Sequence, residues 1–403
     1  MAKNQYKKEP LKNNVEEMFI GPFGSSLKNE CFVDEEDAYC MVYEQKHAIQ
    51  KTLDGKNRFV DKNKYYELKR FTIKPGDIIV SCRGTIGETF IVPENAPLGI
   101  MHPSIMKIRL KPNVYNIEYF NLLLKNRLKD YNKSANGSGI KMAISATELG
   151  KEMFPIPPMD EQQKVSQIFL TVDRLIVLRQ QQLAKLDELV KARFVEMFGD
   201  PINNPMKWTV SKIEDITAQE KNALKAGPFG SALKKEFYVR SGYKIYGQEQ
   251  VICGDASFGD YYIDEEKYKE LKNCAVQAGD ILISLVGTYG KTLIMPDNYE
   301  AGIINPRLMK ITLNKNKVTP IYFKYYFESN ALKASMDANT HGGTMGILNL
   351  GIIRQMKIQV PPLSLQNQFA AFVERVDKQK QTVQQSLEKL ELMKKALMQE
   401  YFG

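Results

Sequence analysis

The chain has 403 residues, a length that suggests two or three domains. Its composition, 43% hydrophobic and 26% charged residues with a formal net charge of +9 at pH 7, is that of a globular protein. It contains no run of 18 or more apolar residues and starts without the apolar stretch of a signal peptide, so we expect a cytoplasmic protein with no membrane span. Five cysteines without a Cys-x-x-Cys pair argue against a disulfide framework or a zinc ribbon, and reduced, mostly packed thiols are expected.

Most motifs in the chain occur twice, at a nearly constant separation. Gly-Pro-Phe-Gly-Ser at residues 21–25 returns at 227–231, which is 206 positions later. Gly-Asp-Ile at 76–78 and Met-Lys-Ile at 106–108 both return 203 positions later. Each unit of such a repeat is large enough to bury its own core, unlike the short units of a solenoid. The sequence therefore predicts two tandem modules, at residues 1–155 and 201–359.

The first module is predicted to mix strands with helices. A turn at residues 73–77 leads into a short apolar run at 78–80, which is typical of a buried strand. Further strands are expected at 90–92 and 105–110, and a helix at 117–131. The module lacks a counterpart of Trp208, so part of its opening strand is expected to be missing or rebuilt.

The second module repeats this order. Strands are expected at residues 281–283, 293–295 and 308–313, followed by a helix at 321–336. The two copies stop resembling each other between residues 29 and 67 and between 235 and 270. Two scaffolds that diverge only in defined segments indicate one task performed on two different targets.

The segments at 156–200 and 360–403 are predicted to be long helices. Apolar residues recur in each at heptad spacing, as in a coiled coil, while a helix within an ordinary bundle is the alternative. The Pro-Pro before each helix fits a helix start, and Gly199 and Gly403 stand where each would end. The residues expected in the seam are Val165, Phe169, Val172, Ile176, Leu183, Leu186, Val190, Phe369, Val373, Val376, Val383, Leu387, Leu390 and Leu397.

No catalytic motif is evident in the sequence. Residues 287–292 approach a phosphate-binding loop, but Leu285 replaces its first glycine, and the first copy has Glu88 where phosphate would require a cation. A glycine-rich turn between strands explains both copies better. The three histidines, at 47, 102 and 341, have no metal-ligand spacing.

Polar, glycine-rich loops instead indicate binding. The loops at 134–141 and 338–344 occupy corresponding places and carry small polar and basic residues, which suit contacts with phosphates and base edges. The excess of positive charge is four in each of residues 1–160 and 201–360, and zero in residues 161–200. The candidate DNA contacts are Lys28, Arg83, Thr85, Ser138, Lys141, Lys234, Thr288, Lys291, His341 and Thr344.

These motifs together resemble a known family. The run from Phe154 to Val165, Phe-Pro-Ile-Pro-Pro-Met-Asp-Glu-Gln-Gln-Lys-Val, leads into a long heptad helix and closely resembles the end of a target recognition domain in the specificity subunit of type I restriction-modification systems. Residues 356–369 give the second occurrence, with Ser364-Leu365 in place of the usual acidic pair. Lys-Pro-Gly-Asp-Ile-Ile at 74–79 and Trp-Thr-Val-Ser-Lys-Ile at 208–213 also look like recurring stretches of these domains.

The resemblance implies an α+β fold in which two duplicated target recognition domains are joined by two long antiparallel coiled-coil helices with an internal pseudo-two-fold. It also implies a non-catalytic subunit that recognises a bipartite target in double-stranded DNA. In such systems two methyltransferase subunits bind the helices and use S-adenosylmethionine, restriction subunits join through the complex, and the specificity subunit itself carries no cofactor or metal.

Two alternatives to this interpretation remain. A self-contained methyltransferase or nuclease with duplicated DNA-binding parts would bind S-adenosylmethionine or a metal by itself. A scaffold of two protein-binding modules would not bind DNA even with its partners present.

Overall fold

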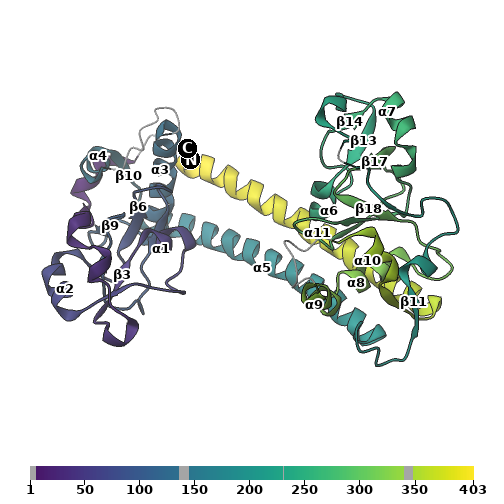
Figure 1. Cartoon of the computed structure of the whole chain (residues 1–403). Coiled ribbons are helices and arrows are strands. Elements are labelled where there is room, and N and C mark those ends of the chain that lie inside the picture. The colour runs from purple at the N-terminus through teal and green to yellow at the C-terminus, as the bar shows by residue number, and fades with distance from the viewer. Residues whose placement is uncertain (1–5, 136–144, 230, 340–347) are drawn as a thin grey trace. The chain divides into compact units, whose positions relative to one another are not determined.

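A computed structural model describes residues 6–135, 145–229, 231–339 and 348–403, with the side chains of 130–135 and 335–339 excepted (Figure 1). The chain divides into two compact units. Unit 1 contains residues 1–178 and 386–403, and unit 2 contains residues 179–385. Each unit therefore includes one module together with about half of each long helix.

Unit 1 is built on two small sheets. The larger sheet is antiparallel, in the order β2 (Val15–Ile20), β9 (Ile105–Leu110), β6 (Ile78–Ser81) and β7 (Thr89–Ile91). The smaller has the order β4 (Phe59–Val60), β3 (Cys40–Tyr43), β8 (Gly99–Met101) and β5 (Thr72–Ile73), with β3 and β8 parallel. Strand β6 separates two cores, because Ile78 and Val80 lie in the main core while Ile79 lies in the core beside the smaller sheet.

The helices of unit 1 frame these sheets. They are α1 (Gln45–Gln50), α2 (Lys62–Glu67), α3 (Ile117–Ala135) and α4 (Ala146–Lys151). Strand β1 (Lys7–Pro10) pairs with β10 (Met153–Ile156) over all four residues. Short 3-10 turns lie at Leu11–Asn13, Gly24–Ser26, Asn29–Cys31, Glu35–Asp37 and Lys69–Phe71.

Unit 2 repeats the same plan in the same chain order. Its larger sheet has the order β12 (Leu224–Ala226), β18 (Leu308–Ile311), β15 (Ile281–Ser284) and β16 (Thr292–Ile294). Its smaller sheet has the order β14 (Tyr262–Ile263), β13 (Tyr243–Tyr246) and β17 (Gly302–Ile304), with β13 and β17 parallel. Strand β11 (Thr209–Lys212) pairs with β19 (Lys357–Val360) as β1 pairs with β10.

The helices of unit 2 are α6 (Gln248–Cys253), α7 (Glu265–Glu270), α8 (Pro320–Phe327), α9 (Asn330–Asn339) and α10 (Leu350–Gln355). Its 3-10 turns lie at Ile213–Ile216, Lys235–Phe237 and Lys272–Cys274. The matching topology confirms the predicted duplication and the α+β class. It extends through residues 29–67 and 235–270, where the copies share elements although their sequences differ.

The two long helices are α5 (Met159–Phe198) and α11 (Leu363–Phe402). In unit 2 the second half of α5 packs with the first half of α11, and in unit 1 the first half of α5 packs with the end of α11. The helices are therefore antiparallel within each unit. Helix α5 ends as expected at Gly199, which adopts φ +79° while its N–H donates to the Val195 carbonyl over 2.8 Å.

A buried glutamine fixes the start of each long helix to its module. In unit 1 the Gln162 side-chain oxygen accepts from the Asn116 N–H at 2.9 Å, and its amide donates to the Val114 and Pro157 carbonyls. In unit 2 Gln366 bonds the Thr319 N–H and the Lys317 and Pro361 carbonyls in the same pattern. Because each glutamine belongs to α5 or α11 and bonds the backbone at the start of α3 or α8, it ties the starts of the two helices together.

The ends of the long helices are parts of the module cores. The Phe402 ring lies 5.4 Å from that of Tyr119 and 5.9 Å from that of Phe169 in unit 1. In unit 2 the Phe198 ring lies 4.8 Å from that of Tyr322 and 5.5 Å from that of Phe369. The last residues of α11 thus complete the core of the first module.

Two expectations about individual elements were wrong. The helix predicted at 321–336 is two helices, because Glu328 ends α8 and accepts from the Thr292 N–H at 2.7 Å, and the Ser329 hydroxyl then accepts from the Leu332 N–H. The opening strand of the first module is not shortened: β1 has four residues, as β11 has. The Trp208 indole instead contacts the end of α5, where its N–H donates to the Phe198 carbonyl over 3.0 Å.

Candidate nucleic-acid interface

A glycine-rich turn joins β6 to β7 in unit 1 and β15 to β16 in unit 2. Gly84 and Gly87 adopt φ of +68° and +85°, and Gly287 and Gly290 adopt +70° and +74°, so the turn requires glycine at these positions. The Ser81 hydroxyl accepts from the Glu88 N–H at 2.9 Å, and the corresponding Ser284 hydroxyl accepts from Lys291 at 3.0 Å. A phosphate-binding loop leads into a helix, whereas these turns connect antiparallel strands.

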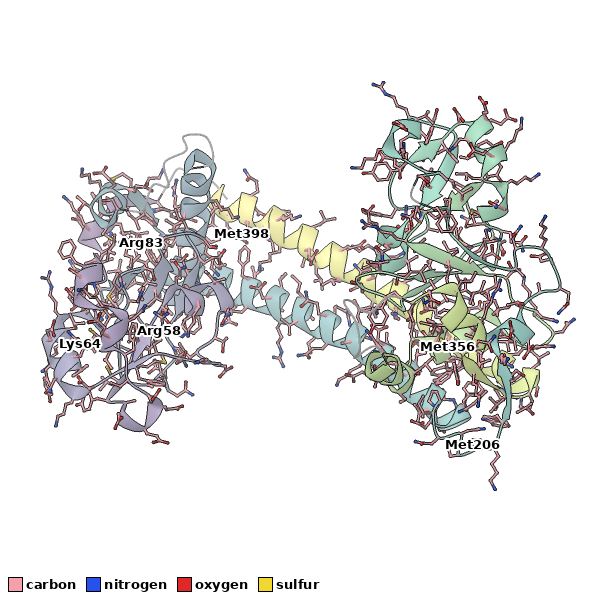
Figure 2. The ribbon with its side chains drawn as sticks, in the orientation of Figure 1. Arg58, Lys64, Arg83, Met206, Met356 and Met398 are labelled. Atoms are coloured by element: carbon pink, nitrogen blue, oxygen red, sulfur yellow. The ribbon has the colours of Figure 1, made fainter. Side chains whose placement is uncertain are left out.

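The turns present the predicted side chains differently. Arg83 and Thr85 in unit 1 and Thr288 in unit 2 are exposed, and Lys291 is half-buried. Figure 2 labels Arg83 in unit 1. Burial raises the pKa of the neighbouring Cys82 thiol to about 12, so this cysteine is neutral and unsuited to act as a nucleophile at neutral pH.

A second turn lies against each glycine-rich turn. The Cys82 N–H donates to the Ser104 carbonyl over 2.9 Å, and the Leu285 N–H donates to the Arg307 carbonyl over the same distance. Burial lowers the pKa of His102, whose Nδ1 lies 2.7 Å from the Ser104 hydroxyl, so its ring is neutral at pH 7. Arg307 is exposed in unit 2 and adds a positive charge that sequence reasoning did not select.

The Gly-Pro-Phe-Gly loop is the third member of this group. The Gly21 N–H donates to the Ile105 carbonyl and the Gly227 N–H to the Leu308 carbonyl, each over 2.9 Å. Lys28 and Lys234, which follow the loop, are exposed, and Lys234 lies 3.5 Å from the Glu236 carboxylate. Within each unit the hydrogen bonds therefore bring these three loops together at one end of the larger sheet.

A glutamine at the start of α1 and of α6 also faces the glycine-rich turn. A Cβ on Gly84 would lie 3.9 Å from the Gln45 amide nitrogen, and the Gln248 amide donates to the Val286 carbonyl. Glutamine pairs well with adenine edges, and sequence reasoning missed both residues. Their separation of 203 positions, the same as for the recurring motifs, is the signal that would have found them.

Unit 2 has a cleft of about 770 Å³ beside these residues. Its lining includes Lys235, Tyr238, Gln248, Tyr261, Asn305 and Arg307. The Tyr238 and Tyr261 rings lie 5.5 Å apart, so the cleft combines flat aromatic surfaces with cationic and amide groups. This combination suits a nucleic acid, because bases stack on rings and phosphates attract cations.

Four predicted contacts lie outside the described residues. They are Ser138, Lys141, His341 and Thr344. The described chain resumes after these two segments at Ser145, which caps α4, and at Leu348, which is buried in the main core of unit 2.

The fourteen predicted seam residues are all buried or partly buried. Val165 and Phe169 lie in the main core of unit 1, and Val190, Phe369, Val373 and Val376 lie in that of unit 2. Leu186 and Leu397 pack against these same cores. Of the rest, Val172, Val383 and Leu387 are buried, and Ile176, Leu183 and Leu390 are partly buried. The Asp187 carboxylate pairs with Lys380 at 2.6 Å, and Asp173 pairs with Lys394.

Other kinds of site are not evident in the described part of the chain. No group of three or more His, Cys, Asp or Glu side chains there is placed to hold a metal ion. No helix among the described residues is both long and apolar enough to cross a membrane. His47 acts within the fold, because its ring accepts from the Glu44 N–H at 3.0 Å and contacts the Asn57 amide oxygen at 2.9 Å.

Comparison with known proteins gives consistent results. The family model "Type I restriction modification DNA specificity domain" matches residues 36–188 and again residues 205–392. A Methanocaldococcus jannaschii protein provisionally named as the specificity subunit of the type I restriction enzyme MjaX is 24% identical over 349 residues, or 84% of this chain and 80% of that protein. The type I restriction enzyme EcoBI specificity subunit of Escherichia coli is 19% identical, over 76% of this chain and 68% of that protein.

Solved structures share the fold. A chain from a structural study of assembly and conformational transition in the type I R-M system superimposes with a TM-score of 0.62 at 15% identity, covering 100% of this chain and 98% of that chain. The S subunit of a type I restriction-modification system from M. genitalium gives a TM-score of 0.55 at 14% identity with the same coverage.

Proposed function

The chain belongs to the family of type I restriction modification DNA specificity domains, and on that premise we propose that it recognises a split DNA sequence, with one half read by each unit. The family assignment confirms the resemblance inferred from the motifs. One observation carries the proposal: the same three loops meet in both units, but they present different side chains.

The matched positions make this difference concrete. Arg83 of unit 1 corresponds to Val286 of unit 2, and His102 corresponds to Asn305. Arginine pairs with guanine and asparagine with adenine, so a shared backbone with such replacements would recognise different bases. Lys28 and Lys234 are the same in both units, which suits contacts to phosphates that carry no sequence information.

We propose further that the chain is not itself an enzyme and carries no cofactor. It would direct two methyltransferase subunits, which bind S-adenosylmethionine, and through them the restriction subunits. The glycine-rich turns support this proposal because they lack the geometry of a phosphate-binding loop, and Cys82 is an unreactive thiol. The exposed apolar face of α5, which includes Leu170, Val177 and Leu178, supports a partner on the long helices.

Methylation mapping tests the DNA-reading function directly. In a host that carries the chain together with its methyltransferase subunits, we expect methylated adenines at one split sequence with two defined halves and a gap of fixed length. Removing the chain should abolish this methylation. A continuous target, or methylation that persists without the chain, would contradict the proposal.

An exchange of modules tests the assignment of one half to each unit. Replacing residues 1–150 with the module of a relative should change one half of the target and keep the other. Because Phe402 packs on Tyr119, the incoming module must keep an aromatic residue at that position, and thermal unfolding should be checked first. A change in both halves would show that the units do not read independently.

Purified chain alone separates this function from the alternatives. We expect no methyl transfer and no thermal shift with S-adenosylmethionine, because that cofactor would belong to the partner. A stabilising shift would favour a self-contained methyltransferase. An assembled complex that failed to bind DNA would favour a protein-binding scaffold.

A further inference from the structure

Phe23 and Phe229, the central residues of the two Gly-Pro-Phe-Gly loops, are the most exposed large hydrophobic side chains that the structure describes. Their exposed fractions are 88% and 91%, and the next highest is 64%, for Leu392. Single exposed apolar residues are common on protein surfaces and need no explanation. The same residue exposed to the same degree at the corresponding position of two duplicated units does need one.

The backbone holds each ring in this outward position. In unit 1 the Ser26 N–H donates to the Phe23 carbonyl over 2.8 Å, and Pro22 and Leu27 on either side are buried. In unit 2 the Ala232 N–H donates to the Phe229 carbonyl over 2.8 Å. The loops are anchored on both sides, so little backbone freedom is lost when the ring meets a ligand.

The glycine that begins each loop allows this anchoring. A Cβ on Gly21 would lie 2.3 Å from the His102 carbonyl oxygen, and one on Gly227 would lie 1.9 Å from the Asn305 carbonyl oxygen. Neither position has room for a side chain. The loop is therefore pressed against the second turn in both units, although that turn begins with His102 in unit 1 and with Asn305 in unit 2.

Exposed cations lie on the loop that carries each ring and on the turns packed against that loop. Unit 1 has Lys28 after the loop and Arg83 on the adjoining glycine-rich turn, and unit 2 has Lys234 and Arg307. Acidic side chains are present as well: Glu236 lies beside Lys234, and Glu88 on the glycine-rich turn of unit 1 pairs with Lys51. An isolated ring among cations is too small for a protein-docking patch, which needs about 800 Å² per partner, but it fits DNA, where phosphates surround flat apolar bases.

We propose that Phe23 and Phe229 are wedges that each press against a base step in the half-sequence read by their own unit. This proposal rests on the proposed DNA-reading function. The wedge holds the duplex in register, while side chains on the neighbouring turns contact the base edges. It acts equally on different sequences because every base has an apolar face, which explains why the residue is the same in both units.

The experiment uses the full chain assembled with its methyltransferase subunits and a duplex that carries the mapped target. 2-Aminopurine is placed in turn at positions of each half-sequence other than the methylated adenine, because its fluorescence rises when a base is unstacked. The variants are Phe23→Ala and Phe229→Ala, with Phe23→Trp and Phe229→Trp to keep a flat ring. Phe258→Ala, which removes an exposed phenylalanine elsewhere in unit 2, is the control.

We expect each alanine variant to weaken specific binding at least about 10-fold. Phe23→Ala should remove the fluorescence rise in one half-sequence only, and Phe229→Ala in the other. The tryptophan variants should retain both properties, and Phe258→Ala should match the unaltered chain. Thermal unfolding should be unchanged in all variants, because the side chains are exposed.

Three results would overturn the wedge. The first is that the alanine variants bind the target with an affinity within twofold of that of the unaltered chain. The second is that the 2-aminopurine fluorescence still rises in the alanine variants. The third is that Phe258→Ala loses as much binding affinity as they do. If the unaltered complex binds the split target with both halves required, these results refute the wedge alone. If the unaltered complex does not bind a split target, the proposed function itself fails.

Discussion

The first halves of α5 and α11 have the same inner face and different outer faces. On the inner face Val165, Phe169 and Val172 of α5 correspond to Phe369, Val373 and Val376 of α11, and all six are buried. On the outer face α5 exposes Leu170, Val177 and Leu178, each at 47% or 48%, where α11 has Glu374, Gln381 and Thr382.

This difference shows which face of each helix must be apolar for the fold and which need not be. A buried face must stay apolar in both copies, because it completes the core of its own unit. The polar outer face of α11 shows that the fold tolerates such residues there, so the apolar outer face of α5 must serve another purpose.

The largest effect is expected from truncating the inner face. Phe369→Ala removes a ring that lies within 5.5 Å of three others, from Phe194, Phe198 and Tyr325, and should cost about 3–5 kcal/mol of unfolding free energy. Val165→Ala at the matched position of α5 removes less volume and should cost less. Calorimetric unfolding measures both. Equal small losses would mean that these helix ends are not part of the module cores.

The next largest effect concerns the matched glutamines. Gln162→Leu and Gln366→Leu each leave an N–H and two carbonyls without their partner and should cost about 2–4 kcal/mol. Gln163→Leu, at the neighbouring exposed position, should change stability by less than about 0.5 kcal/mol. Denaturant titration gives all three values. A large difference between Gln162→Leu and Gln366→Leu would show that the two inner faces are not equivalent.

Transplanting the outer face of α11 onto α5 tests its purpose. The triple variant Leu170→Glu, Val177→Gln and Leu178→Thr should leave the unfolding free energy within about 1 kcal/mol, since these side chains are exposed. It should weaken binding of the methyltransferase partner about 10-fold or more by removing apolar contact area. Sedimentation analysis of mixtures measures the affinity, with Gln163→Leu as the control. Unchanged assembly would exclude this face as the docking surface.

The smallest effect is expected from the ion pairs between the helices. Asp187→Asn removes the partner of Lys380, and Asp173→Asn removes that of Lys394. Both pairs are exposed enough that each change should cost no more than about 1 kcal/mol, and less at high salt. Thermal unfolding at low and high ionic strength checks this. A larger loss that persists in salt would mean that charge, rather than the apolar seam, holds the helices together.

Local patterns predicted much of the fold. The strand at 105–110 and the start of the helix at 117 agree with β9 and α3, because apolar spacing and turn residues act over a few positions. The end of α8 after Phe327 was not predicted, although the polar residues Glu328, Ser329 and Asn330 follow it in the sequence. The helix ends there because Glu328 accepts from the Thr292 N–H, a contact with a distant segment. The role of the chain's last residues was also missed, since no local pattern shows that Phe402 completes the core around Tyr119.

Repeated motifs and heptad spacing are properties of the chain order, so they suffice to predict the duplication, the α+β class, the two long helices and the family. Which residues share a surface depends instead on how distant segments pack. The tertiary structure placed Gln45 and Gln248 beside the glycine-rich turns and exposed Phe23 and Phe229, although a phenylalanine in sequence looks like a core residue. Exposure and proximity depend on contacts between distant segments, such as Gly21 against His102, and no local pattern specifies such contacts.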